Sequence, residues 1–398
     1  MDSDTGTHES DLYIGKASGT DWTGHYGSYV DFLNQVFQPD SPDGFFYRIL
    51  PKLYNDPALV MENSYIITEG GDFCAAVGSF PFRTSVLGRP LNGRIIGNVA
   101  VHAQARSKGY MKQLMSLAMA DARSEGTDYM LLGGLRHRYR YFSFEACGFG
   151  YSFTVTTTNL RDCYGVDRRS AVALKEIQRS DVTALSEIAV LHNRQPFHIQ
   201  RPRERLYETL ISWESRPYAA YVGADLVGYL VLDHGGNTVV EFVAGARSVA
   251  EEMVIAALTQ MEKNELSFHL PPFATEAIAL LTDLCEACTV FSDVKYTVLN
   301  FCNVLAAMLP LRAAYLPLAD GTVVLRIHGF AGLQSLRLTV AGRRIEVTET
   351  NGLPDLELSH LDAMNLLFSV CCPRRSALPP AIASWFPLPL YISPLDNA

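Results

Sequence analysis

A short stretch near residue 100 combines residue types and spacing that suit the binding of a phosphate group. Val99 and Val101 close an apolar run, and Gly109 opens a run of helical period. Arg106 and Lys108 add positive charge to the loop between them. The first turn of a helix has unpaired backbone N–H groups and the positive end of the helix dipole, so it can hold a pyrophosphate. The alternative interpretation is an ordinary strand-to-helix connection with a solvated basic loop.

The elements around this stretch form a supersecondary unit and favour the first interpretation. Residues 64–67 and 74–80 are β-rich runs separated by a Gly-Gly turn, which predicts a hairpin. Residues 94–101 predict a third strand, residues 109–123 an amphipathic helix and residues 129–132 a fourth strand. A strand, a helix and a strand within about 40 residues indicate a βαβ unit, and hence a mixed or parallel sheet.

The same order of elements occurs again further along the chain. Residues 218–222 and 226–232 predict a second hairpin across a Gly-Ala-Asp turn. Residues 239–243, 249–261 and 266–270 then predict a strand, a helix and a strand. We interpret this order as an internal duplication of one α/β fold.

The final part of the chain follows a different pattern. Apolar residues alternate with others in 323–327, 336–340 and 345–347, which predicts an antiparallel sheet. Residues 362–368 predict a helix, so this segment indicates an α+β domain. Residues 385–391 are rich in proline and aromatic side chains, and they predict an extended tail that packs onto another part of the protein.

The stretch near residue 100 resembles the acetyl-CoA signature of the GNAT N-acetyltransferases, in which Val-x-Val is followed by Arg-x-x-Gly and an amphipathic helix. The resemblance implies a strand that diverges from its neighbour, with the pantetheine arm in the gap and the pyrophosphate on the loop amides. Met111 departs from the pattern, which usually has Gly or Ala there. The residues that the resemblance assigns to acetyl-CoA are Val99, Ala100, Val101, Arg106, Ser107, Lys108, Gly109, Tyr110, Met111, Lys112 and Gly134.

The whole chain is similar to one branch of that superfamily, the enhanced intracellular survival (Eis) acetyltransferases. This resemblance implies an N-terminal GNAT domain that binds acetyl-CoA (1–160), a central degenerate GNAT domain (161–296) and a sterol-carrier-like domain with a tail (297–398). The predicted fold class is α/β and α+β, with two tandem GNAT folds of mixed sheets flanked by helices. Where the first copy has residues 106–109, the second has Ala246-Arg247-Ser248-Val249 without a glycine, so we expect no second cofactor site.

The resemblance also assigns a general acid. Tyr139 falls on the position of the family's acid, and a phenol with a pKa of about 10 can protonate a leaving thiolate of comparable basicity. The aromatic neighbours Tyr141, Phe142 and Phe144 are expected to pack in the core. Arg136 and the residues beside it are expected to form a solvated or interdomain face.

The base implied by the resemblance is the terminal α-carboxylate, which here belongs to Ala398. Asp396 and a water relay through His102 are the alternatives. The predicted reaction is direct attack of a primary amine on the thioester of acetyl-CoA. The acceptor implied by the family is an aminoglycoside, another polyamine or a protein lysine, and the family architecture implies a homo-oligomer, commonly a hexamer.

Composition argues against several other classes of protein. The chain has 398 residues and a net charge of -9, which disfavours a nucleic-acid partner. Four acidic residues precede Lys16 and no apolar run follows it, so we expect no secretory leader, and no segment is apolar enough to predict a membrane span. Eight cysteines are ordinary for a reducing compartment, and we expect the cytoplasm.

Cys285 and Cys288 have no second pair at zinc spacing, so we expect packing thiols and no metal. A function from another class stays open. In that alternative the chain is a non-catalytic binding or scaffold protein that uses its sterol-carrier-like domain for an apolar ligand.

Overall fold

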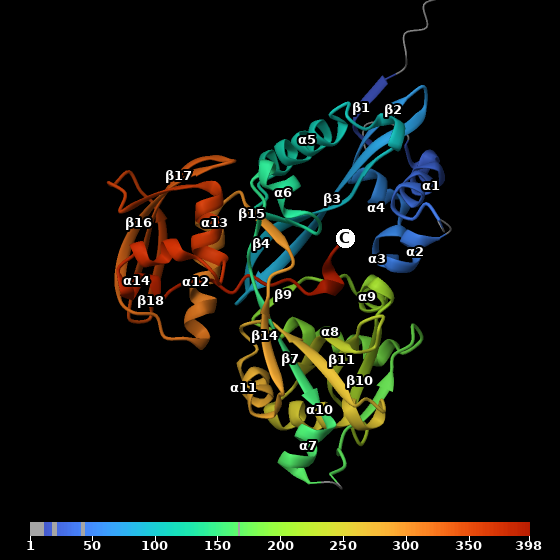
Figure 1. Ribbon diagram of the computed structural model, residues 1–398, viewed down its shortest axis with the longest axis vertical. Coiled ribbons are helices and arrows are strands. Elements are labelled where there is room, and N and C mark those ends of the chain that lie inside the picture. The colour runs from blue at the N-terminus through green and yellow to red at the C-terminus, as the bar shows by residue number, and fades with distance from the viewer. Residues whose placement is uncertain (1–11, 18–21, 41–43, 166–167) are drawn as a thin grey trace, which may run out of the picture.

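The computed structural model describes residues 12–17, 22–40, 44–165 and 168–398. The acidic residues that precede Lys16 lie outside the described residues. The described strands form three sheets, and helices cover each of them (Figure 1). None of the described helices combines the length and the apolar character that crossing a lipid bilayer requires. The fold is therefore a mixed α/β fold, as the sequence predicts.

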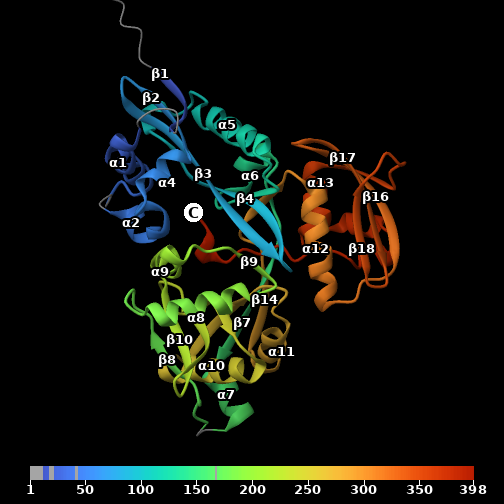
Figure 2. The same ribbon diagram turned by 180° about the vertical axis from the view of Figure 1, so that it is seen from behind.

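The first sheet lies between two groups of helices, which Figure 2 shows from behind. Its strands, in spatial order, are β1 (Leu12–Lys16), β2 (Ser64–Glu69), β3 (Asp72–Val86), β4 (Arg89–Val101), β5 (Tyr129–Leu132), β15 (Lys295–Val298) and β6 (Glu145–Ala146), and β9 (Phe197–Ile199) pairs with β3. Its helices are α1 (Tyr26–Phe37), α2 (Phe45–Ile49), α3 (Pro51–Tyr54), α4 (Pro57–Glu62), α5 (Tyr110–Ser124) and α6 (Arg136–Tyr139). The predicted hairpin β2–β3 and the parallel pair β4–β5 are confirmed.

Alternating side chains give this sheet two apolar faces. Ile66 and Ala76 pack under helices α1 to α4, whereas Ile67 and Val77 pack against α5. The amphipathic helix predicted over 109–123 is thus confirmed as α5, which buries the stripe of Leu114, Met115, Ala118, Met119 and Ala122.

The second sheet repeats the predicted order of hairpin, strand, helix and strand. Its strands, in spatial order, are β14 (Ala287–Phe291), β7 (Gly150–Thr156), β13 (Glu265–Leu270), β12 (Thr238–Ala244), β11 (Asp225–Leu232), β10 (Arg216–Val222) and β8 (Ala173–Glu176). Its helices are α7 (Thr157–Tyr164), α8 (Val182–Asn193), α9 (Leu206–Leu210), α10 (Arg247–Gln260) and α11 (Thr275–Leu284). Strands β12 and β13 are parallel, as β4 and β5 are. Cys288 lies exposed on β14, so its expected packing role is wrong, whereas Cys285 packs against the core of this sheet.

The first two sheets exchange strands near both predicted boundaries. Strand β7 ends at Thr156, before residue 160, yet it pairs with β13 of the second sheet. Strand β15 begins at Lys295 and pairs with β5 of the first sheet. The chain therefore crosses between the sheets on either side of the central segment, and neither sheet is built from one continuous segment.

The third sheet differs from its prediction in one strand. It consists of β18 (Arg344–Glu349), β17 (Gly332–Ala341), β16 (Gly321–Gly329) and β19 (Leu356–Ser359), with helices α12 (Phe301–Tyr315), α13 (His360–Phe368) and α14 (Pro380–Ala383). Strand β19 runs parallel to β16, so the expected purely antiparallel sheet is wrong. The cause is the connection after β18, which carries the chain from one edge of the sheet to the other before β19 begins.

The C-terminal tail packs as predicted and returns to the first sheet. Trp385, Leu388 and Leu390 are fully buried in the core that the third sheet shares with β5 and β15. From there the tail runs between the first and second sheets, and the end of the chain lies beside β4 (Figure 1). The last residue therefore belongs spatially to the first sheet.

Candidate active site

Strands β4 and β5 separate at the point where the sequence predicts a gap. The parallel pairing joins Gly93–Ile96 to Tyr129–Leu132 and then ends, while β4 continues to Val101. A bulge accompanies the separation, because the pairing of β4 with β3 shifts register and Asn98 has a φ of 55°. Among the described strands, none therefore pairs with the backbone of Val99 to Val101 on the β5 side, which leaves its polar groups available to a ligand.

The loop after β4 leads into an uncapped helix start. Gly109 is the N-cap of α5 with a φ of 79°, and no side chain caps the helix. A Cβ on Gly109 would have no heavy atom within 4 Å. The first-turn N–H groups of α5, which include those of Tyr110, Met111 and Lys112, thus lie at an open surface and can receive an anion.

The basic residues of the loop behave differently from one another. Lys108 forms an ion pair with Glu69 at 2.8 Å, and Tyr110 donates a hydrogen bond to the same carboxylate. Hydrogen bonds from Lys108 and Tyr110 lower the pKa of Glu69. Arg106 is exposed and, within the described parts of the chain, has no ion-pair partner. Arg106 is therefore the loop cation that is free to meet a phosphate, whereas Lys108 would have to exchange partners.

Tyr139 stands behind the gap, at the end of α6. It is 6% exposed and packs in the core between α5 and the sheet. Gly134, with a φ of 108°, lies so close that a Cβ there would be 3.1 Å from the Tyr139 ring. Burial raises the pKa of Tyr139, and the nearby Arg138 opposes that shift. The phenol is therefore protonated at neutral pH and can serve as an acid.

The residues around Tyr139 correct one expectation and bear out another. Tyr141 is 64% exposed, not part of the core, and the ammonium of Lys112 lies 4.3 Å from its ring centroid. Arg136 is exposed, as expected of a solvated face, and it and Arg140 pair with the fully buried side chain of Glu145. Burial opposes ionisation of Glu145, but hydrogen bonds from Arg136 and the Ala146 N–H, together with the charges of both arginines, outweigh it, and the pKa of Glu145 is lowered. This buried carboxylate anchors the segment that carries Tyr139.

The end of the chain reaches the opposite face of the same strand. A Cβ placed on Gly97 of β4 would lie 3.2 Å from the carbonyl carbon of Ala398. Ala398 packs against the apolar cluster under α1 to α4, whereas Tyr139 belongs to the cluster under α5. The two predicted catalytic groups thus approach the separation of β4 and β5 from opposite faces of the sheet.

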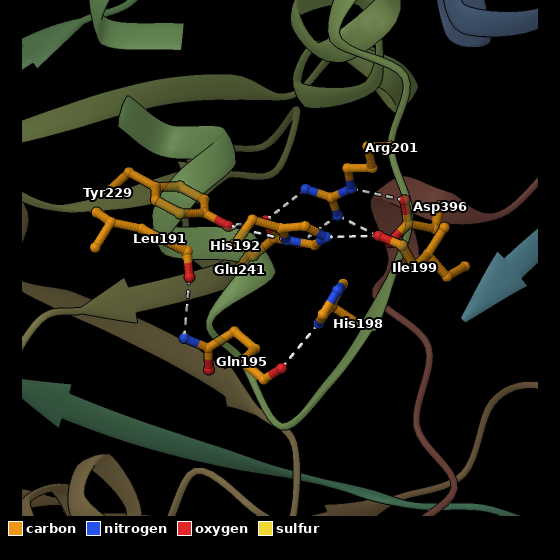
Figure 3. Close-up of polar contacts among 9 residues, drawn as sticks. All are labelled: Leu191, His192, Gln195, His198, Ile199, Arg201, Tyr229, Glu241 and Asp396. Carbon is orange, nitrogen blue, oxygen red and sulfur yellow. Dashed lines mark hydrogen bonds and ion pairs between the residues drawn. The ribbon is translucent and has the colours of Figure 1, made fainter. Parts of the chain in front are cut away.

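The two alternative bases lie in different surroundings. Asp396 is buried, and both of its carboxylate oxygens accept hydrogen bonds from Arg201 at 2.8 Å (Figure 3). His102 follows the end of β4, five residues beyond Gly97, which corresponds to about 16 Å along a strand. Its Nδ1 faces the backbone N–H of Gln104 within its own loop.

Three residues of this region were missed from the sequence. Arg201 also pairs with Glu241 of β12 at 2.6 Å, and the ammonium of Lys52 donates to the carbonyl of Leu395 at 2.5 Å. These contacts join positions 40, 195 and 343 residues apart. No local motif signals such contacts, so only the fold reveals them. Among the described residues, no group of three or more His, Cys, Asp or Glu side chains could hold a metal ion.

Comparison with protein families agrees with this geometry. Residues 23–147 match the family model for the acetyltransferase (GNAT) domain. This part of the chain, which contains β4, the loop, α5 and Tyr139, is thus similar to a GNAT acetyltransferase domain. Such a domain implies acetyl-CoA as the acetyl donor and a small-molecule acceptor. Comparison with curated proteins gives no match.

Solved structures extend the likeness in fold to almost the whole chain. A GCN5-related N-acetyltransferase from Kribbella flavida shares 19% identity at a TM-score of 0.67, covering 98% of this chain and 99% of its own. A GCN5-related N-acetyltransferase from Anabaena variabilis shares 15% sequence identity at a TM-score of 0.68, and the match covers 97% of this chain and 100% of that chain. Eis1 from Mycobacterium abscessus shares 14% sequence identity at a TM-score of 0.64, and the match covers 98% of this chain and 100% of that chain. The chain therefore has the fold of these proteins along almost its whole length.

Proposed function

We propose that the chain is an acetyl-CoA-dependent N-acetyltransferase that transfers an acetyl group to a primary amine by direct attack. The observation that carries the proposal is the placement of two groups on opposite faces of the first sheet, near one gap. A buried phenol lies on one face of the first sheet, and the chain terminus lies on the other, beside Gly97. A proton donor and a proton acceptor on opposite sides of a bound thioester are what acetyl transfer to an ammonium substrate requires.

The cofactor site in this proposal follows β4 and α5. The free backbone groups of Val99, Ala100 and Val101 would hydrogen-bond the pantetheine arm, and Gly134 would lie beside it. The pyrophosphate would rest on the amides of the loop and the first turn of α5. The residues proposed for that contact are Arg106, Ser107, Lys108, Gly109, Tyr110, Met111 and Lys112. Open space at Gly109 and the absence of a side-chain cap on α5 support this placement.

The proposed chemistry moves protons between two residues of the chain. The α-carboxylate of Ala398 is ionised at neutral pH, since its ordinary pKa is about 3.5, and it accepts a proton from the ammonium of the acceptor. The amine then attacks the thioester carbon, a C–N bond forms and the C–S bond breaks. Tyr139 gives its proton to the departing sulfur. The nitrogen loses its second proton to solvent, from which Tyr139 recovers one. Backbone N–H groups near Val99 to Val101 would stabilise the negative charge on the carbonyl oxygen.

Several finer assignments belong to this proposal. The acceptor would be an aminoglycoside-like amine, a polyamine or a protein lysine, and the net charge of -9 suits a cationic acceptor of any of these kinds. We also propose that the second sheet and its helices form a degenerate GNAT domain, and that residues 297–398 form a sterol-carrier-like domain. A homo-oligomer, a hexamer by the Eis resemblance, and a cytoplasmic location complete the proposal.

The decisive experiment combines binding with turnover. Isothermal titration should detect one acetyl-CoA per chain, and a thiol-release screen against a panel of amines should identify an acceptor. Absence of binding at high micromolar acetyl-CoA would exclude the enzyme and favour the scaffold alternative.

A C-terminal extension tests the proposed base. Adding a tag after Ala398 moves the carboxylate away from β4, so amine acetylation should be abolished while acetyl-CoA binding is retained. The same tag at the N-terminus is the matched control and should leave turnover unchanged. Full turnover of the C-terminally tagged chain would rule out the α-carboxylate.

A further inference from the structure

A buried ion-pair cluster holds the tail close to its end. The Arg201 side chain is 3% exposed and donates to two carboxylates at once. Its Nε and Nη2 bind Asp396 at 2.8 Å each, while its Nη1 and Nη2 bind Glu241 at 2.8 and 2.6 Å (Figure 3). Both contacts are bidentate, and the planar guanidinium makes such pairs rigid in orientation as well as strong. Tyr229 donates a further hydrogen bond to Glu241 at 2.7 Å.

The cluster joins three parts of the fold at one point. Arg201 follows β9, which pairs with β3 of the first sheet, and Glu241 lies on β12 of the second. Asp396 comes from the tail, in a short turn where its N–H and that of Asn397 donate to Ser393 and Pro394. Arg201 therefore fixes the tail relative to both sheets.

A second contact holds the tail from the other side. Lys52 of α3 is buried, and its ammonium donates to the carbonyl of Leu395. Leu395 is thus held by Lys52 from the helices of the first sheet, and Asp396 is held by Arg201, which is itself paired with Glu241 of the second sheet. Ala398 lies two residues beyond Asp396, so its carboxyl group can move at most about 7 Å from this anchor.

We propose that Arg201, supported by Lys52, is a positioning residue that sets the terminal carboxylate of Ala398 at the gap between β4 and β5. This inference rests on the proposed function, in which that carboxylate is the base. A base must lie within hydrogen-bond reach of the proton it takes, and a displacement of about 1 Å can cost about 10²-fold in rate. A flexible tail would not meet that demand, because chain termini fray unless they are tied down.

The central test replaces Arg201 and measures catalysis and tail release separately. In Arg201→Gln, kcat for amine acetylation should fall about 10²-fold, while the Kd for acetyl-CoA changes less than about twofold. Carboxypeptidase should release Ala398 faster than from the unmodified chain, since the terminus is no longer held. Arg201→Lys keeps the positive charge but cannot form bidentate pairs. Its kcat and its rate of Ala398 release should lie between those of Arg201→Gln and those of the unmodified chain.

A matched control uses an arginine of the same part of the molecule. Arg247, at the start of α10, is 49% exposed and pairs with Asp283 at 3.4 Å. Arg247→Gln should change neither kcat nor the rate of carboxypeptidase release. Removing Arg201 leaves two buried carboxylates unpaired and can prevent folding. In that case Asp396→Asn, which keeps the shape of the side chain and leaves the pair with Glu241 intact, carries the same test.

The outcomes separate this inference from the proposed function. If a C-terminal tag abolishes turnover but Asp396→Asn and folded Arg201→Gln keep full kcat, the carboxylate is the base and the positioning role is overturned. Faster release of Ala398 with unchanged kcat would also overturn it. Full turnover with the tag would instead remove the base itself and the proposal that rests on it.

Discussion

The first and second sheets hold similar gaps between parallel strands, but the chain uses them differently. In the first, β4 separates from β5 after Ile96. In the second, β12 pairs with β13 only at Thr238 and Val239 before the strands part. Each diverging strand also shifts register against its antiparallel neighbour close to the point of separation, and a helix follows each of them. The framework of a ligand gap is thus present twice.

The helix starts show why only one gap suits a phosphate. Gly109 caps α5 in the left-handed region, whereas Ala246 caps α10 with extended backbone at a φ of -159°. The structure also corrects the sequence alignment of the two loops. Val249 lies inside α10, so Ala246, not Val249, corresponds to Gly109. The second loop therefore differs from the first in backbone conformation as well as in residue type.

The gaps also differ in what fills them. A cavity of about 60 Å³ remains at the second gap, and Tyr391, Ile392, Ser393 and Asp396 of the tail form one of its walls. The tail then continues to the first sheet and ends at its gap, beside Gly97. One gap therefore serves as an anchor for the tail, and the other, left open at its helix start, is where we propose that chemistry occurs.

The largest expected effect concerns the acid behind the first gap. At the second gap, the segment after β13 contributes Phe273, which has no hydroxyl group. Tyr139→Phe therefore gives the first gap an aromatic side chain without a hydroxyl group, like that of the second gap. The ring and its packing stay, but the proton is lost. Turnover should fall on the order of 10²-fold or more, while acetyl-CoA affinity stays nearly constant.

Tyr141→Phe is the control, because that side chain is exposed and points away from the core. Steady-state thiol release measures both variants. A comparable loss in Tyr141→Phe with none in Tyr139→Phe would contradict the assignment of the acid.

A smaller effect is expected at the helix start. Gly109→Asp places a carboxylate beside the proposed pyrophosphate and should weaken acetyl-CoA binding at least tenfold, about 1.4 kcal/mol. Gly109→Asn has the same shape without the charge and also tolerates a positive φ, so it should bind more tightly than the aspartate variant. Isothermal titration measures both.

The matching change in the second sheet sharpens the comparison. Ala246→Gly and Val249→Gly should leave the stoichiometry at one acetyl-CoA per chain, because the tail forms a wall of that gap and narrows it. Two acetyl-CoA molecules per chain, in either variant or in the unmodified protein, would show that the second gap is not degenerate.

Much of the framework could be predicted because its signals are local. The period of α5, the turn at Gly70 and the basic loop before Gly109 each lie within a few residues, and all three appear in the fold. The contacts that complete the site are not local. Arg201 meets Asp396 across 195 residues and Lys52 meets Leu395 across 343. Burial of a charge depends on the tertiary fold, and a single sequence carries no local sign of it.

Strand exchange escaped prediction for a related reason. The pattern of apolar residues in β7 and β15 can predict a strand, but it does not indicate which sheet either strand joins. Tyr141 was expected to be buried because aromatic side chains usually are, but the tight turn from Tyr139 to Ser143, which has a φ of 64°, directs it outward. Pairing partners and side-chain direction are set by the whole fold.

The smallest expected effect concerns the pH dependence of the anchor at the second gap. His192 lines the cavity there and is buried beside Tyr229, Arg201 and Glu241. Burial, and then the charge of Arg201, lower its pKa to about 4, although the Glu241 and Asp396 carboxylates oppose the shift. The folded protein therefore keeps this imidazole neutral where the unfolded chain, with a pKa near 6.5, binds a proton.

The sign of the effect follows from proton binding. Between pH 6.5 and about 4 the unfolded chain holds more protons at this position than the folded protein, so the free energy of unfolding falls as the pH falls through that window. Above that window His192 adds nothing to the pH dependence of stability. The melting temperature of His192→Gln should fall by a few degrees less than that of the unmodified chain over this range. It should not become flat, because burial also lowers the pKa of His360 to about 4. His234→Gln, at an exposed site, should follow the unmodified chain. Equal slopes for His192→Gln and the unmodified protein would mean that water reaches the second gap freely, which would remove the contrast between a closed anchor and an open site.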